Sequence, residues 1–265
     1  MSLIIDEMDL AARRARFRRI AGDAASERHV QGTAGFGTMR EKRLHAVVKK
    51  YLCEDADFHE VGVRDTRFVA DVRVDNDIYE VQTGNFYPLK AKIAHYLTAT
   101  DCTVTVVHPL AVERTVAWVD PADGTVTKPR KVSYRSRPTE LLPALYPLLP
   151  FLSDPRLRFR LLLLSVDDFR LLDGWSRDRK RGSSRYERIP TDLLDDVTFS
   201  SPDDFRRLLP ADLPSPFRVS DFSRLSRLRS RAAYAAVRVL AALGIVRAAD
   251  PIGRAMAFEV IGDRD

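Results

Sequence analysis

The sequence predicts a mixed α/β protein, and three observations lead to this fold class. Between residues 38 and 107 the apolar pattern changes period in the order helix, three strands, helix and strand. Hydrophobic residues make up 45% of the 265-residue chain and charged residues 30%, which excludes global disorder. After the prolines crowded between residues 202 and 216, the pattern changes to two helices and a β-ribbon. We therefore divide the chain into a basic helix with a linker (1–37), an α/β domain (38–200) and a C-terminal unit (201–265).

The N-terminal region is expected to hold a helix over residues 6–20, with Leu10, Phe17 and Ile20 on its apolar side. Arginines at positions 13, 14, 16, 18 and 19 occupy the other sides. They leave two interpretations open, a solvated charged face or a phosphate-binding arm. The small and polar residues from 22 to 37 indicate a linker.

The α/β domain is expected to begin with a helix over residues 38–52. Thr38 and Glu41 form a capping box, and apolar residues recur at helical spacing at Leu44, Val47, Val48 and Tyr51. Three strands should follow over 58–63, 67–74 and 77–83, then a helix over 85–97 capped by Asn85, and a strand over 102–107. A hairpin over 114–119 and 125–132, a broken helix over 139–152, a strand over 158–166 and a mobile loop over 175–188 complete the region.

Composition bounds the class of partner and the compartment. The 43 basic and 37 acidic residues give a net charge of +6, and 35 of the basic residues are arginines. A basic protein meets a polyanion more often than an acidic one does. We expect a cytoplasmic protein without membrane contact, because no signal peptide and no run of about 18 apolar residues is present. Cys53 and Cys102 are expected as buried thiols, and the five histidines show no metal-ligand spacing with them.

Two acidic residues face each other across the predicted hairpin of the second and third strands. With Asp75 and Asn76 at the tip, Val74 opposes Asp77, and the same register places Asp71 opposite Glu80. It also pairs Ala70 with Val81 and Val72 with Tyr79, which keeps one face apolar. Opposed carboxylates persist when they are well solvated, when one is protonated, or when a divalent cation lies between them. The residues alone leave open a solvated polar face and a magnesium site.

The order of these acidic residues resembles the PD-(D/E)XK nuclease superfamily over residues 38–110. Glu41 lies on a helix, Asp71 on the second strand and Glu80-Val81-Gln82 on the third, followed by a helix with Lys90 and a fourth strand. The resemblance implies a nuclease-like sandwich, with a mixed sheet flanked by helices. It also implies that Asp71 and Glu80 bind Mg²⁺ or Mn²⁺ and that Glu41 is an auxiliary acid.

This sequence departs from the family pattern at the usual lysine. Gln82 stands where the lysine usually stands and carries no positive charge. Lys90, early in the following helix, is the expected substitute, as lysine migration in the family would allow. Glu41 keeps a second interpretation, as the acid of the capping box.

The C-terminal unit resembles a winged helix-turn-helix module over residues 217–262. A helix over 220–225 and a helix over 231–243 precede Gly244, and two strands follow around a turn at 250–253. The resemblance implies DNA binding through the second helix, with protein docking as the alternative. Charge favours DNA, since residues 220–247 hold six arginines and one acid. The expected nucleic-acid-binding residues are Arg224, Arg227, Arg229, Arg231 and Arg238.

These observations predict a Mg²⁺-dependent endonuclease-like protein that cleaves DNA and is targeted by its C-terminal module. The competing class is a catalytically inactive nuclease-fold protein that binds DNA or acts as an adaptor, and Gln82 keeps this class open. DNA is the expected partner, and a homodimer is compatible with the sequence.

Overall fold

The protein is built on one mixed β-sheet, as a computed structural model shows for residues 4–30, 42–63, 67–175 and 181–262. The strands lie in the order β1-β2-β3-β4-β6-β7. β3 and β4 are parallel, as are β4 and β6, and the other neighbours are antiparallel. The strands are β1 (His59–Gly62), β2 (Val69–Val74), β3 (Asp77–Val81), β4 (Thr103–Val119), β6 (Leu157–Trp175) and β7 (Arg181–Phe199), and β5 (Arg130–Lys131) pairs with the far half of β4.

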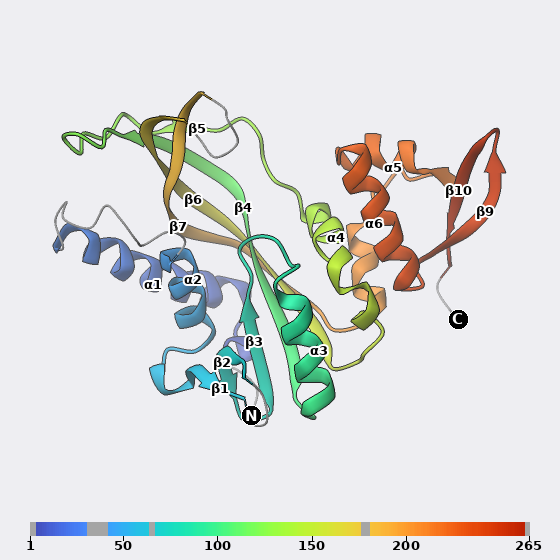
Figure 1. The fold of residues 1–265 in the computed structure, drawn as a ribbon, viewed down its shortest axis with the longest axis horizontal. Helices are drawn as coiled ribbons and strands as arrows, with labels where there is room; N and C mark the ends of the chain where they lie inside the picture. The colour runs from blue at the N-terminus through green and yellow to red at the C-terminus, as the bar shows by residue number, and fades with distance from the viewer. Residues whose placement is uncertain (1–3, 31–41, 64–66, 176–180, 263–265) are drawn as a thin grey trace.

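Helices cover both faces of this sheet (Figure 1). On one face lie α1 (Leu10–Val30), α2 (Lys42–Leu52) and a 3₁₀ turn (Ile4–Glu7), around a core that includes Phe17, Val48 and Tyr51. On the other face lie α3 (Leu89–Ala99), α4 (Leu141–Ala144) and a 3₁₀ helix (Tyr146–Phe151), around a second core. The predicted mixed α/β class and the order helix, three strands, helix, strand are confirmed.

The apolar faces predicted for two helices agree with the structure. All four apolar residues expected on the inner face of α2 are at most 3% exposed, and Leu89, Ile93 and Leu97 of α3 are buried. Asn85 is not the cap of α3, however. Its side chain instead accepts the backbone N–H of Tyr87 at 3.0 Å, which forms a turn two residues before the helix.

Two segments expected to be irregular are regular. α1 continues through Gly22 to Val30, where a linker was expected, because the packing of Ile20 and Ala21 outweighs the cost of about 1 kcal/mol for a glycine inside a helix. Residues 181–188, expected in a loop, belong to β7, which pairs with β6 along nearly its whole length. The predicted strands 102–107 and 114–119 are one continuous strand, β4.

The arginines of α1 bind acidic side chains of the protein itself. Arg14 and Arg18 bind Asp192 of β7, while Arg16 and Arg19 bind Glu54 after α2. The pKa of Asp192 lies well below its ordinary value because these two guanidinium groups bind it. The structure therefore shows a use of these arginines beyond the two interpretations left open by the sequence: their salt bridges fasten α1 to β7 and to the segment after α2.

The C-terminal unit consists of β8 (Phe217–Arg218), α5 (Val219–Ser226), α6 (Ser230–Ala242), β9 (Val246–Ile252) and β10 (Ala255–Val260). The three strands form a small sheet in the order β8-β10-β9. Gly244 ends α6 as predicted, with a φ of 71°, and the N–H of Ile245 returns to the carbonyl of Leu240. Before this unit, the proline-rich segment forms a 3₁₀ helix (Pro202–Leu208) whose Phe205 and Leu208 join the same core as α3, α4 and α6.

A buried ion pair joins the two longest strands to the N-terminal helices. Arg160 on β6 donates from Nε and Nη2 to the two carboxylate oxygens of Asp196 on β7, both at 2.7 Å. Tyr51 of α2 donates its hydroxyl to the same carboxylate at 2.6 Å, and Arg13 of α1 lies 3.4 Å from it. Arg160 also donates to Asp6. Burial and the charge of Asp196 raise the pKa of Tyr51, so this hydroxyl remains a donor.

We expect Arg160→Met to lower the free energy of unfolding by about 3–5 kcal/mol, because it leaves the buried Asp196 without its main counter-charge. Arg158→Met, two residues earlier on the same strand and exposed, is the matched control and should change stability by about 0.5 kcal/mol or less. Urea unfolding followed by circular dichroism measures both. Equal losses in the two variants would contradict this role of the ion pair.

Candidate functional site

The β2–β3 hairpin has the predicted register near its tip. Val74 pairs with Asp77, Arg73 with Ile78 and Val72 with Tyr79. The ladder stops at Val72, so the predicted pairings of Asp71 with Glu80 and of Ala70 with Val81 are not part of it, and the Asp71 carboxylate accepts the N–H of Val81 at 2.8 Å. The expected common apolar face also fails: Ala70 joins the core under α3, while Val72 joins the core under α2.

Asp71 is held as an anion at the end of this hairpin. Its Oδ2 atom lies 3.1 Å from Nε2 of His45, on α2, and also accepts the N–H of Val81. Burial acts to raise the pKa of Asp71, but the hydrogen bond and charge of His45 and the bond from Val81 outweigh it, so the pKa lies below its ordinary value. Asp71 therefore stays ionised at neutral pH.

The pKa of Glu80 is shifted in the opposite direction, and its side chain is only 1% exposed. Lys92 of α3 donates to its Oε2 atom at 2.6 Å, and the Tyr96 hydroxyl donates to its Oε1 atom at 3.1 Å. Burial raises the pKa of Glu80 to about 7, and the like charge of Asp71 adds to this rise, while the Lys92 ammonium opposes it. Two neighbouring carboxylates thus hold different protonation equilibria, an arrangement that acid–base chemistry uses.

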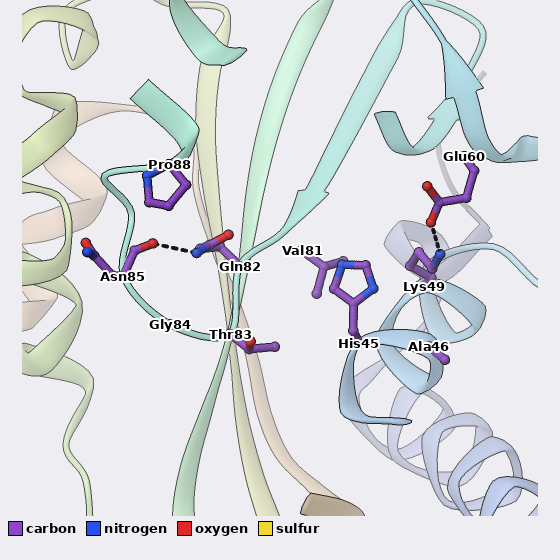
Figure 2. A pocket seen from close by; sticks show the side chains of 10 residues that line it. All are labelled: His45, Ala46, Lys49, Glu60, Val81, Gln82, Thr83, Gly84, Asn85 and Pro88. Atoms are coloured by element: carbon purple, nitrogen blue, oxygen red, sulfur yellow. Dashed lines mark hydrogen bonds and ion pairs between the residues drawn. The ribbon is translucent and has the colours of Figure 1, made fainter. Parts of the chain in front are cut away.

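A cleft of about 690 Å³ opens beside Asp71, and its lining includes His45 and Val81, the two residues that contact the Asp71 carboxylate. Figure 2 shows His45 and Lys49 of α2 on one side of it, and Gln82 and Asn85 of the loop after β3 on the other. Lys49 is paired with Glu60, whose φ of 52° is unusual for a residue with a side chain. The cleft therefore presents polar groups from α2, β1 and the segment that leads into α3.

The other residues predicted for the site fall in different places. Gln82 lines the cleft, but its amide donates to the carbonyl of Asn85 at 2.5 Å. Lys90 is exposed, and the ammonium that contacts Glu80 is that of Lys92, two residues later. Glu41 lies outside the described residues, as does Thr38.

Sequence reasoning missed His45, Lys92 and Tyr96. Lys92 and Tyr96 are four residues apart on α3, a spacing that places them on one helix face, and this signal was available in the sequence. His45 precedes Lys49 by the same spacing, on the side of α2 that lines the cleft. Nothing in the spacing of His45 relative to Asp71 predicts their contact, because Asp71 follows His45 by 26 positions and lies beyond β1, on β2.

The five arginines predicted to bind nucleic acid are all exposed on the C-terminal unit. Within the part of the chain that the structure describes, no acidic side chain forms a salt bridge with any of them, namely Arg224, Arg227, Arg229, Arg231 and Arg238. Their charges are therefore available to an external anion, unlike those of α1.

The fold and this site define a mixed α/β protein in which a half-buried carboxylate, Asp71, lies beside a polar cleft and a buried one, Glu80, contacts α3. A family model described as Domain of unknown function (DUF8091) matches residues 42–200, and the chain belongs to this family. No curated protein and no solved structure matches the chain. None of the helices in the described ranges is long and apolar enough to cross a membrane.

The pKa of Glu80 predicts a pH-dependent contribution to stability. The ordinary pKa of a glutamate is 4.5, and that of Glu80 in the folded protein is about 7, so the folded state binds a proton more tightly than the unfolded state. Below pH 4.5 this difference contributes its full amount to the free energy of unfolding. That contribution is lost as the pH rises toward 7, by an amount on the order of 3 kcal/mol. Glu80→Gln should therefore gain stability relative to the metal-free wild-type protein between pH 5 and pH 8.

Urea unfolding across this pH range measures the difference, in buffers that contain EDTA. Glu60→Gln is the control, because the Glu60 side chain is 60% exposed and its stability curve should run parallel to that of the wild type. If the Glu80→Gln curve is parallel as well, Glu80 does not carry the raised pKa.

Proposed function

We propose that this protein is a Mg²⁺- or Mn²⁺-dependent endonuclease-like enzyme that hydrolyses phosphodiester bonds in DNA, with Asp71 and Glu80 as its metal-binding residues. The observation that carries the proposal is the pair itself. Two carboxylates from adjacent strands lie close enough that the charge of Asp71 adds to the effect of burial in raising the pKa of Glu80 to about 7. Asp71 itself contacts His45 and Val81, which line the polar cleft. The strand order β1-β2-β3-β4, flanked by α2 and α3, supports the resemblance to the PD-(D/E)XK superfamily.

The donor set fits a hard divalent cation. Mg²⁺ binds proteins through one or two carboxylates and fills its remaining positions with water and substrate phosphate. Oδ1 of Asp71 has no hydrogen-bond partner among the described residues, whereas Oδ2 has two. No group of three or more His, Cys, Asp or Glu suited to a metal occurs in those ranges.

When bound, a divalent ion would supply an acidified water and offset the charge that develops on the phosphoryl group. The residues of the chain prepare this site. His45 and the Val81 N–H hold the Asp71 carboxylate in one orientation and keep it ionised. Glu80 exchanges a proton near neutral pH, and Lys92 holds a positive charge at its Oε2 atom.

Lys92 takes the part that we first expected of Lys90. An ammonium close to the paired carboxylates stabilises negative charge on a substrate and on an attacking oxygen. Gln82 lacks this charge, and its amide is engaged with Asn85, which supports Lys92 as the substitute.

The C-terminal unit is proposed to hold the DNA. Its two helices and three-stranded sheet support the resemblance to a winged helix, and the exposed arginines of the loop before α6 and of α6 itself favour phosphate contacts. Salt-sensitive binding follows from these contacts, because each neutralised phosphate releases counterions.

A specific observation also favours the competing function, an inactive nuclease-fold protein that binds DNA or a partner protein. Glu80 is 1% exposed, and Lys92 and Tyr96 each occupy one of its oxygens. A metal ion has to displace at least one of these contacts, and a protein that never does so would bind without turnover. Metal binding separates the two functions.

We expect the wild-type protein to bind Mn²⁺ and to release protons as it does so. Glu80 is about half protonated at pH 7, and its carboxyl group must lose this proton before it can bind the metal ion. Calorimetry in two buffers of different ionisation enthalpy measures this release. Asp71→Asn should abolish the binding while leaving the circular dichroism spectrum unchanged. A wild-type protein that binds no metal would support the inactive class.

We expect Asp71→Asn to abolish metal-dependent cleavage, because it removes a metal-binding charge, and Lys92→Gln to reduce it by about 10²–10³-fold, because it removes the ammonium at the reacting phosphate. Lys90→Gln, on the same helix and exposed, is the matched control and should cleave like the wild type. Assays should cover single-stranded, duplex and branched DNA. Loss in Lys90→Gln with full activity in Lys92→Gln would reverse this assignment.

A further inference from the structure

The segment from residue 128 to 137 is a second basic surface, distant from the C-terminal arginines. Its sequence, KPRKVSYRSR, holds five basic and no acidic residues. Lys128, Arg130 and Lys131 are exposed, and two of them form β5, the outer strand that pairs with β4 at Thr115 and Val116. The segment therefore presents its charges from the edge of the sheet.

Three of these charges have no salt-bridge partner among the residues that the structure describes. Arg135 forms a salt bridge with Glu113 at 3.2 Å. By contrast, no acidic side chain of the described residues pairs with Lys128, Arg130 or Lys131. The arginines of α1, which look equally basic in the sequence, are bound by Asp192 and Glu54. An external anion would meet unpaired charge on the β5 segment and little of it on α1.

An aromatic residue with a fixed hydroxyl, Tyr134, follows these cations in the same segment. Tyr134 is 58% exposed, yet its hydroxyl donates to Oε1 of Glu140 at 2.8 Å. Glu140 is itself held by the N–H of Arg137 at 3.0 Å. The ring is thus oriented by its hydroxyl while most of its surface faces solvent, which is the arrangement of a stacking platform.

The segment returns from β5 to the neighbourhood of the cleft. Glu140 is close enough to His108 to act on its charge, and the His108 ring lies 2.6 Å from the carbonyl of Gln82. Along the long axis of the molecule, β5 lies toward one end and α5 and α6 toward the other, with the loop between β3 and α3 in between (Figure 1). A strand of nucleic acid held at β5 would therefore lead toward the site.

We propose that residues 128–137 bind single-stranded nucleic acid, with Lys128, Arg130 and Lys131 contacting phosphates and Tyr134 stacking on a base. Free cations along an extended edge, interrupted by an exposed aromatic ring, are the combination that single-strand binding uses. This inference adds single-stranded nucleic acid as a ligand of the β5 segment. It rests on the proposed function only for the direction in which the strand runs, because binding itself requires no cleavage.

Fluorescence anisotropy with labelled oligothymidylate, in EDTA and over a series of salt concentrations, tests the surface. The triple variant K128Q/R130Q/K131Q should bind more weakly and lower the slope of log K against log salt by about 2, at about 0.7 for each lost phosphate contact. Tyr134→Ala should weaken binding of the single strand about 5- to 150-fold with an unchanged slope. Tyr134→Phe keeps the ring and should retain most of the affinity.

The control triple R18Q/R19Q/K50Q removes the same charge from exposed positions at α1 and α2, where acidic neighbours already bind both arginines. Its slope should stay close to that of the wild type. Equal slopes in the two triple variants, or full affinity in Tyr134→Ala, would overturn the proposal. The proposal would also be overturned if Tyr134→Ala weakened binding to duplex DNA as much as binding to the single strand. The same holds if K128Q/R130Q/K131Q lost only its binding to phosphatidylserine vesicles.

These outcomes are independent of the proposed enzyme activity. The variant K128Q/R130Q/K131Q could bind oligonucleotide more weakly while the wild-type protein cleaves no substrate with any metal. This pair of results would support the nucleic-acid-binding surface and contradict the proposed nuclease activity. Unchanged binding by K128Q/R130Q/K131Q, together with cleavage that is lost in Asp71→Asn, would contradict the surface and support the nuclease activity.

Discussion

The buried pair of Arg160 and Asp196 is the interaction on which the architecture around the site depends. It joins β6 to β7 inside the protein, and its remaining bonding capacity is used by Tyr51 of α2, Arg13 of α1 and Asp6 before α1. Two charges buried together are tolerable only when geometry and extra hydrogen bonds satisfy them. Because α2 is fastened through Tyr51, His45 on the same helix is held where it meets Asp71.

The candidate site combines three elements that the sheet topology brings together. The β2–β3 hairpin supplies both carboxylates, α2 supplies His45, and the crossover helix α3 between the parallel strands β3 and β4 supplies Lys92 and Tyr96. Each acid therefore meets a different helix on a different face of the sheet. This separation gives Asp71 a lowered pKa and Glu80 a raised one, although they are neighbours across a hairpin.

The distribution of charge matters more than its total for the partners of this protein. The net charge of +6 includes arginines that serve only the fold, such as Arg14 and Arg18 on Asp192. Salt bridges of this kind leave little field outside the molecule. Among the described residues, the five arginines predicted to bind nucleic acid, and Lys128, Arg130 and Lys131 of the β5 segment, form no such salt bridge, so these two surfaces expose unpaired positive charge.

The sequence by itself determined the order of elements, the apolar faces of α2 and α3, the hairpin register near Asp75 and Asn76, and the C′ glycine at Gly244, because periodicity and turn chemistry are local. It also singled out Asp71 and Glu80, although the ladder ends at Val72, before the pairing that was predicted for them. Local patterns could not extend α1 through Gly22 or β7 through residues 181–188, since long-range packing and strand pairing override weak propensity. Only the tertiary structure decided that Lys92 rather than Lys90 reaches Glu80, that His45 meets Asp71, and which arginines remain unpaired, because contacts between distant segments leave no periodic trace in a single sequence.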